Sequence, residues 1–481
     1  MGQEVHCSSF TQKEFKLFRD KMEEQLALLR KWESEDSFSK VYPKIGLEIE
    51  GWFANESMLP ADCAPEFLKK LNHEQVVPEI SKFNFEINSL PYDFKGECFE
   101  SLKKELFEIW KKIQDTSKEF NCSPLLIGTL PTLRHHMLSL DIMSPHNRYS
   151  VMNEQVMKFR NNRPMKLHIE GKDQLSLSMN SVIAECAATS LQIHLGVKLE
   201  DSAKYYNASL ISSAFLLAVS ANSPYLFGKE LWDESRILGF EQSVDLECES
   251  EETKEKLGRV TFGSGFLENS IIDLFEENVR DYPILLPESF SSELEDLDHL
   301  KFHNGTIWRW TRPVLGHDGN SPALRIEQRV PSSGPTLVDS LANTVFFLGL
   351  VDYLASSDLP LKNYISFKDA QNNFYKAAKQ SYYCQVTWVD GEDYDMQKLL
   401  LEKIIPNVKV HLAKRGISKD AIEYYIGDII YNRCKKAVNG AIWQKAFIHM
   451  HGKRFQEMVE CYSSNQKKNL PVHLWSLDRE C

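Results

Sequence analysis

The sequence has 481 residues, of which 42% are hydrophobic and 26% charged, so it predicts a folded protein with a substantial core and excludes a disordered chain. Its formal net charge of −12 makes the average surface repel polyanions, and because no basic cluster reverses this field, we expect no nucleic-acid partner. The sequence has no signal-peptide pattern, no apolar stretch near the roughly 18 residues of a membrane span and no C-x-x-C pair among its ten cysteines, so we expect reduced thiols, no membrane partner and a cytoplasmic location.

An amphipathic helix over residues 11–34 is the first element that the sequence predicts. Thr11 and Glu14 have the spacing of a capping box, in which each side chain accepts a hydrogen bond from the other residue's backbone N–H. Apolar residues then recur at the intervals that line one face of a helix. We expect residues 1–40 to form this N-terminal helix ahead of a catalytic α+β domain over residues 41–350.

Four segments with an alternating pattern follow along the chain. They are KIGLEIEGWF at 44–53, KFNFEINSLP at 82–91, LQIHLGV at 191–197 and ALRIEQRV at 323–330. Each has an aliphatic side chain at every second residue, which is typical of a strand that buries one face. A helical pattern at 97–119 separates the second predicted strand from the third.

Helical patterns dominate the chain beyond Pro335, including 394–413, 418–436 and 439–463. We therefore expect residues 351–481 to form a helical C-terminal part that packs on the catalytic domain. Before the fourth predicted strand, the segment WRWTRP contains Arg309 and Arg312, which we assign to stacking on the neighbouring tryptophans and leave out of the candidate site.

The second face of each predicted strand is polar or charged. Its residues are Glu48 and Glu50 on the first strand, Asn84, Glu86 and Asn88 on the second, Gln192 and His194 on the third, and Arg325, Glu327 and Arg329 on the fourth. Side chains two apart on a strand point the same way, so each set lies on one surface. For a single E-x-E strand a solvated sheet face is the more common explanation, and a histidine between aliphatic residues is more often a core residue.

Four such strands together favour a site for cations. Carboxylates crowded on one sheet repel one another and are stable there only with positive charge between them. Oxygen ligands suit Mg²⁺ or Mn²⁺, and a histidine among them favours tolerance of Mn²⁺. Arginines interleaved with the carboxylates supply donors for phosphate oxygens. The combination predicts metal-assisted phosphoryl transfer.

The order of these motifs resembles that of the glutamine synthetase superfamily, in which an E-x-E strand precedes a Q-x-H strand and an R-x-E-x-R strand. Nine segments are similar to the bacterial glutamate–cysteine ligase family and its carboxylate–amine ligase relatives. They are GLEIEGWF, FNFEINSLP, GTLPTL, SPHNRY, TSLQIHLGV, ANSPYLFGKELWDESR, NGTIWRWTRPV, LRIEQRVPSSGPTLVD and NGAIWQ. The resemblance implies a glutamine-synthetase-like catalytic domain whose mostly antiparallel sheet bears the active site, with packed helices and a helical C-terminal part.

The resemblance also implies a role for each matching residue. The implied metal ligands are four carboxylates and one histidine, namely Glu48, Glu50, Glu86, Glu327 and His194. The implied catalytic residues are Arg329, Arg325 and Glu50. Contacts to a substrate carboxylate or to phosphate are expected from Arg236, Arg148 and Asn88.

The reaction that the resemblance implies is ATP-dependent, with Mg²⁺ or Mn²⁺ as the metal. ATP would phosphorylate a substrate carboxylate, and an amine would attack the acyl phosphate to give an amide of the γ-glutamyl type, ADP and phosphate. The expected substrates are ATP and small amino acids or carboxylates, whereas the particular acid and amine and the oligomeric state stay open. The alternatives are a guanidino phosphotransferase of the same superfamily and a nucleotide-binding regulatory protein without turnover.

Overall fold

The computed structural model describes residues 4–7, 9–40, 43–249, 256–356 and 365–479. The chain begins with α1 (Gln12–Ser34), and Thr11 and Glu14 form the predicted capping box at its start. Eight helices follow in the first three quarters of the described chain. They are α2 (Ala64–Leu71), α3 (Cys98–Ser117), α4 (Asn147–Phe159), α5 (Ser202–Ser220), α6 (Arg236–Ser243), α7 (Asp273–Asp281), α8 (Asp298–Gly305) and α9 (Leu337–Ala355).

An eight-stranded antiparallel sheet lies at the centre of the fold. Its main path runs through β13 (Thr311–Asp318), β14 (Ser321–Gln328), β8 (Leu191–Val197), β1 (Lys44–Ala54), β3 (Asn84–Asn88) and β2 (Val76–Pro78). Two short strands, β4 (Tyr92–Asp93) and β5 (Ser123–Leu125), also pair with β1. The four predicted strands are therefore confirmed as β1, β3, β8 and β14, and they are neighbours in one antiparallel sheet.

The remaining strands form two-stranded sheets outside the central one. They are β6 (Met165–Glu170) with β7 (Gln174–Met179), β9 (Tyr225–Leu226) with β10 (Lys229–Glu230), β11 (Cys248–Glu249) with β12 (Lys256–Leu257), and β15 (Gln385–Thr387) with β16 (Asp393–Asp395).

Helices make up most of the chain after α9. They are α10 (Phe367–Gln380), α11 (Met396–Leu399), α12 (Ile405–Lys414), α13 (Lys419–Ile422), α14 (Asn432–Lys436), α15 (Gly440–His451) and α16 (Phe455–Lys467). Short π-helical turns join α11 to α12 and α13 to α14, which confirms the helices expected at 394–413 and 418–436. The single helix expected at 439–463 is two helices, because Gly452 has a φ of 82° and ends α15.

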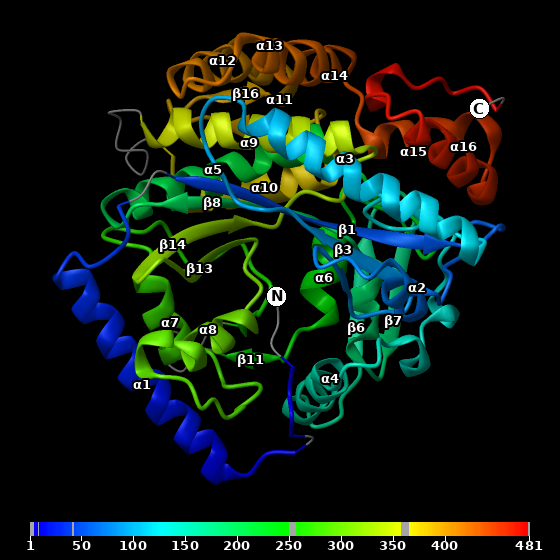
Figure 1. Cartoon of the computed structure of the whole chain (residues 1–481). Helices are drawn as coiled ribbons and strands as arrows, with labels where there is room; N and C mark the ends of the chain where they lie inside the picture. Colours follow the sequence, from blue (N-terminus) through cyan, green and yellow to red (C-terminus); the bar gives the residue numbers. More distant parts are fainter. Residues whose placement is uncertain (1–3, 8, 41–42, 250–255, 357–364, 480–481) are drawn as a thin grey trace.

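Layers of helices cover one face of the central sheet. Figure 1 shows α3, α5 and α9 on one side of the sheet with α12, α13 and α14 outside them, and α1, α4, α7 and α8 on the other side. Ile45, Leu47 and Ile49 of β1 are buried, as the alternating pattern predicts. The mixed α+β architecture with an antiparallel sheet and a helical C-terminal part is thus confirmed, and α9 crosses residue 350, where the sequence suggests a boundary.

Two expectations from the sequence need correction. The first is the expectation that no apolar stretch approaches the length of a membrane span, because helix α9 is long and apolar enough. However, 94% of its most apolar window is buried inside the protein, so α9 is a core helix. Among the residues that the structure describes, eight cysteines are free thiols, whereas Cys461 is disulfide-bonded, so the expectation of reduced thiols is wrong at that position.

Candidate active site

The register of the central sheet brings the polar faces of four strands together. β1 places Glu48 opposite Gln192 of β8 and Glu50 opposite Glu86 of β3. β8 in turn pairs with β14, so that His194 lies opposite Glu327. Segments that are up to 280 residues apart in sequence therefore contribute to one surface.

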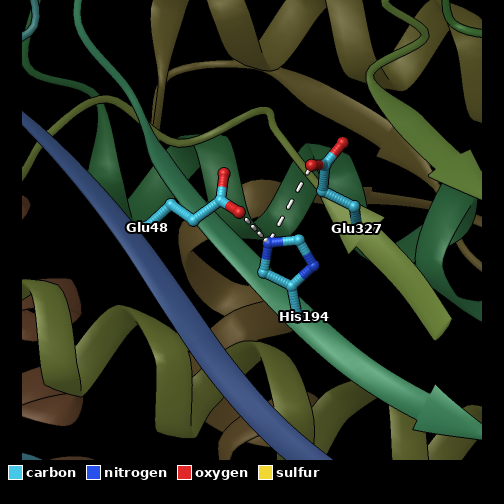
Figure 2. Close-up of side chains that lie close together, drawn as sticks. All are labelled: Glu48, His194 and Glu327. Atoms are coloured by element: carbon cyan, nitrogen blue, oxygen red, sulfur yellow. Dashed lines mark ion pairs between the residues drawn. The ribbon is translucent and has the colours of Figure 1, made fainter. Parts of the chain in front are cut away.

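The first cluster on this surface consists of Glu48, His194 and Glu327 (Figure 2). His194 Nε2 lies 2.9 Å from Glu48 Oε1 and 3.9 Å from Glu327 Oε1, and one ligand atom from each of the three residues lies within 4.8 Å of the others. The cluster is almost closed to solvent, since the side chain of Glu327 is 2% exposed. This set of two carboxylates and one imidazole fits a divalent cation.

Nearby positive charge keeps both carboxylates of this cluster ionised. Burial alone would raise the pKa of Glu327, but Arg312 and Arg329 hold it well below its ordinary value. Burial also opposes ionisation of Glu48, and the neighbouring His194 lowers its pKa again. Glu48 Oε2 is buried and has no hydrogen-bond partner, so this oxygen is available as a cation ligand.

A second cluster lies beside the first and consists of Glu50, Glu79 and Glu86. Ser190 donates to Glu50 through its backbone N–H at 2.6 Å and through its hydroxyl at 2.7 Å. Asn88 Nδ2 donates to Glu86 Oε1 at 2.8 Å, so Asn88 contacts a carboxylate of the site. Burial and then the charges of Glu48, Glu79 and Glu50 raise the pKa of Glu86 well above its ordinary value.

Arg329 lies between the two clusters. Its Nη1 donates to Gln192 Oε1 and, at 3.2 Å, to Glu327 Oε2, while its buried Nε has no hydrogen-bond partner. Burial would lower the pKa of this guanidinium, but the carboxylates of Glu327, Glu50 and Glu48 raise it above its ordinary value. Arg329 therefore stays charged and is held in a fixed orientation.

The two arginines of WRWTRP do not stack on the adjacent tryptophans as expected. Arg312 makes a two-point contact with Glu327, at 2.6 Å from Nε and 3.0 Å from Nη2, so leaving it out of the site was wrong. Arg309 is buried and donates to Glu277 and Asn278. The register of β13 against β14, which pairs Arg312 with Glu327, is the signal that would have found Arg312.

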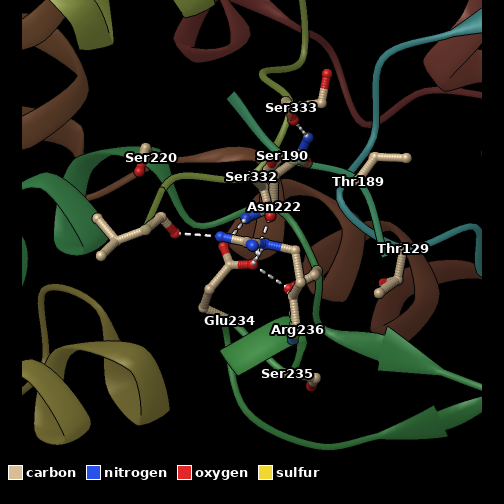
Figure 3. A network of polar contacts seen from close by, with 12 residues as sticks. Thr129, Thr189, Ser190, Ser220, Asn222, Glu234, Ser235, Arg236, Ser332 and Ser333 are labelled. Carbon is tan, nitrogen blue, oxygen red and sulfur yellow. Dashed lines mark hydrogen bonds and ion pairs between the residues drawn. The ribbon is translucent and has the colours of Figure 1, made fainter. Parts of the chain in front are cut away.

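A buried polar network surrounds Glu234 and Arg236 (Figure 3). Arg236 Nη2 donates to the backbone carbonyl of Arg329 at 3.0 Å and to that of Val330, and the guanidinium lies over the ring of Trp310. Arg236 Nε lies 3.5 Å from Glu234, a fully buried carboxylate that also accepts a hydrogen bond from the backbone N–H of Asn222 at 3.0 Å. These contacts of Arg236 hold the backbone of Arg329 and Val330 in place at the end of β14.

The structure places the other two predicted arginines at the margin of the site. Arg325 is exposed and lies opposite Gly196, two residues along β14 from Glu327. Arg148 lies in the first turn of α4, and its Nη2 contacts the hydroxyl of Tyr149 at 2.6 Å. Their assigned contacts to phosphate or to a substrate carboxylate remain predictions.

Sequence reasoning missed two acidic residues of this region. Glu79 follows β2 and completes the second cluster, and Glu185 lies half-buried in a short 3-10 turn near the charges of Glu79 and Glu50. Neither residue lies in an alternating strand pattern, so no periodicity marks them.

Burial and then Glu50 raise the pKa of Glu79 to about 7, and burial followed by Glu79 and Glu50 raises that of Glu185 to about 8.

These raised pKa values make stability depend on pH and on Mg²⁺. The ordinary pKa of both glutamates is 4.5, so the folded protein binds more protons than the unfolded chain from about pH 5 to about pH 8, and its free energy of unfolding falls as the pH rises through that window. We expect the Tm of the protein in EDTA to be lower at pH 8 than at pH 5, and Mg²⁺ to raise Tm more at pH 8, since it binds ionised carboxylates. Thermal unfolding with and without Mg²⁺ at both pH values measures this. Glu86→Gln is expected to shrink the difference, and a Mg²⁺ effect that is equal at both pH values would contradict the cation site.

Comparisons with known proteins identify a family and solved structures of similar fold. The model of a family described as glutamate-cysteine ligase family 2 matches residues 44–415. No curated protein matches the sequence. A solved glutamate–cysteine ligase from Francisella tularensis, in complex with AMP, has a TM-score of 0.54 and 13% identity over 92% of this chain and 91% of that one. A bifunctional glutathione synthetase from Pasteurella multocida has a TM-score of 0.52 and 12% identity over 93% of this chain and 53% of its own length. At these identities the two structures show a shared fold.

Proposed function

The chain belongs to the glutamate-cysteine ligase family 2, and from this membership we propose that it is an ATP-dependent carboxylate–amine ligase that forms an amide bond of the γ-glutamyl type. The observation that carries the proposal is the arrangement on one sheet face of the Glu48–His194–Glu327 cluster beside the charged, partly unpaired guanidinium of Arg329. Such a surface suits the polyphosphate of ATP, which needs positive charge from a cation and from a fork of N–H donors. We also propose a cytoplasmic location, where ATP and Mg²⁺ are supplied.

The proposed reaction has two steps. A free carboxylate resists attack by an amine because its leaving group would be an oxide. In the first step a carboxylate oxygen attacks the γ-phosphorus of ATP, and the bond from that phosphorus to ADP breaks. In the second step the amine nitrogen attacks the acyl carbon, and the bond from that carbon to the phosphate oxygen breaks. Phosphate leaves with the electron pair of that bond, and the nitrogen loses a proton. The products are an amide, ADP and phosphate.

Each part of the site has a role in this scheme. Glu48, His194 and Glu327 would hold Mg²⁺ or Mn²⁺, which when bound supplies positive charge against the phosphates. The second cluster would hold a further cation near the substrate carboxylate. Arg329, fixed by Gln192 and Glu327, would donate hydrogen bonds to the oxygens of the transferred phosphoryl group.

Hydroxylamine tests the acyl phosphate directly. It is a small amine that needs no dedicated pocket, so we expect it to convert the acyl phosphate of the correct acid into a hydroxamate. Formation of the hydroxamate is expected to require ATP, Mg²⁺ and the acid but not the natural amine, with one ADP released per hydroxamate. A panel of amino acids and dicarboxylates is assayed by ferric-hydroxamate colour and by chromatography of the nucleotides.

Two variants define the specificity of this test. Glu50→Ala is expected to abolish hydroxamate formation, because it removes a carboxylate of the second cluster that Ser190 and Gln192 hold by hydrogen bonds. Glu56→Ala removes an exposed carboxylate just beyond β1 and is expected to leave the rate unchanged. Release of AMP and pyrophosphate would mean an acyl adenylate, a phosphorylated guanidine would mean a phosphotransferase, and the absence of ADP above background for every acid would favour a regulatory protein.

A further inference from the structure

Two half-buried cysteines, which we call the thiol pair, lie in contact beside the central sheet. Cys63 is the N-cap of α2, and Cys122 lies between the end of α3 and β5. The thiol of Cys63 donates to Cys122 Sγ at 3.5 Å, although the two residues are 59 apart in the sequence. Because the S–S bond of a disulfide is about 2.05 Å long, the sulfurs need to approach by only about 1.5 Å to form one.

Contacts between α2 and the end of α3 hold the thiol pair together. The ring centroids of Phe67 and Phe120 are 5.6 Å apart, and Lys70 Nζ lies 3.0 Å from Glu119 Oε2. Phe67 and Lys70 belong to α2, whereas Glu119 and Phe120 belong to a 3-10 turn that ends two residues before Cys122. The two backbones that carry the sulfurs are therefore already adjacent in the folded protein.

The two thiols differ in acidity. The hydrogen bond that Cys63 donates lowers the pKa of Cys122, although burial opposes this effect. The same hydrogen bond, followed by burial, raises the pKa of Cys63. Cys122 therefore ionises first, and the thiolate is the form of cysteine that attacks a disulfide.

We propose that Cys63 and Cys122 are a redox-active pair, which small disulfide oxidants convert into an intramolecular disulfide. The Cys122 thiolate attacks one sulfur of the oxidant, so that a mixed disulfide forms and one small thiolate leaves. Cys63 then loses its proton and attacks Cys122 Sγ, and the second small thiolate leaves. In total the two cysteines lose two protons and two electrons, and the oxidant takes them up to become two small thiols.

The disulfide closes the segment of the chain that carries most of the second carboxylate cluster. Glu79 and Glu86 both lie between the two cysteines, on the loop after β2 and on β3. A crosslink of this span restricts the unfolded chain more than the folded one, so we expect the oxidised protein to have a Tm about 3–6 °C higher than the reduced protein. The thiol chemistry needs neither ATP nor an amino acid, so it holds whether or not the chain is a ligase.

Peptide mapping of the folded, full-length protein tests the bond, with oxidised glutathione as the probe. After exposure of the reduced protein and blocking of the remaining thiols, we expect a pair of peptides joined through Cys63 and Cys122, which dithiothreitol separates. Cys248→Ser is the matched control. Cys248 is also half-buried, but its Sγ contacts the backbone carbonyl of Leu246 at 3.8 Å, so this variant should form the link as fast as the parent.

Single variants of the thiol pair test the order of attack. Cys63→Ser is expected to accumulate glutathione on Cys122, because serine keeps a hydrogen-bond donor but cannot resolve the mixed disulfide. Cys122→Ser should accumulate roughly tenfold less glutathione on Cys63 in the same time, because that thiol stays protonated. Neither variant should show the difference in Tm between oxidised and reduced protein that we expect of the parent.

Three results would overturn the proposal. The first is a parent protein whose Cys63 and Cys122 are both alkylated after exposure to the oxidant, with no linked peptide. The second is a link that forms in urea but not in the folded protein. The third is glutathione that stays bound to Cys122 of the parent, which would mean that Cys63 does not reach the mixed disulfide.

Discussion

Arg329→Lys is expected to lower kcat by about 10²- to 10³-fold, or roughly 3–4 kcal/mol of barrier, while the protein stays folded and keeps most of its affinity for ATP. Lysine retains the positive charge between the carboxylate clusters but has no planar fork of donors. It can satisfy Glu327 or a phosphate oxygen, whereas Arg329 contacts Gln192 and Glu327 through Nη1 and still has an unpaired Nε. Steady-state kinetics and calorimetric titration of ATP with Mg²⁺ measure the two effects separately.

A matched arginine outside the site controls for this substitution. Arg163→Lys changes an exposed arginine that pairs with Glu247, and its kcat should equal that of the parent. Equal turnover in Arg329→Lys and the parent would remove Arg329 from phosphoryl transfer. A large loss of ATP affinity with no loss of kcat would instead assign Arg329 to ground-state binding.

The strands that carry the site could be predicted because their pattern is local. A period of two, with aliphatic residues on one face, needs no knowledge of the rest of the fold, and β1, β3, β8 and β14 all follow it. The motif order along those strands was specific enough to indicate the family that the comparisons confirm. What the sequence could not supply was the order of the strands, because pairing between β1 and β8 joins segments about 140 residues apart.

The missed residues depend on this non-local pairing or lie outside regular strands. Arg312 enters the site only through the hairpin register that sets it opposite Glu327. Glu79 reaches the second cluster from a loop, and Glu185 lies in a 3-10 turn, where no periodic pattern distinguishes a buried carboxylate from a solvated one. Arg236 was assigned to substrate from its motif, and that contact stays a prediction; the structure adds that its Nη2 donates to the backbone carbonyls of Arg329 and Val330, just beyond β14. Side-chain direction in irregular segments is the information that the sequence lacks.

The carboxylate of Glu327 is the link between the proposed cation and both arginines, so its loss is expected to have a large effect on the reaction. It accepts hydrogen bonds from Arg312 and Arg329 and lies 3.9 Å from His194 Nε2. A divalent cation bound there and the two arginines would share one anionic group. Neutralising that group weakens the cation site and leaves two half-buried guanidinium groups free to rearrange.

Glu327→Gln is therefore expected to lower kcat/KM for ATP by at least about 10³-fold and to shift the Mg²⁺ dependence of the remaining activity to higher concentration, because an amide oxygen carries no charge to hold a hard cation. The same substitution at Glu241, whose carboxylate accepts hydrogen bonds from Trp310 and Tyr375 outside both clusters, controls for the change from acid to amide and should preserve the rate. Calorimetric titration of ATP in Mg²⁺ and a Mg²⁺ titration of ADP release provide the measurements. If Glu327→Gln binds ATP with Mg²⁺ as tightly as the parent and turns over at a similar rate, Glu48, His194 and Glu327 are not a cation site, and the proposed phosphoryl transfer loses the observation on which it rests.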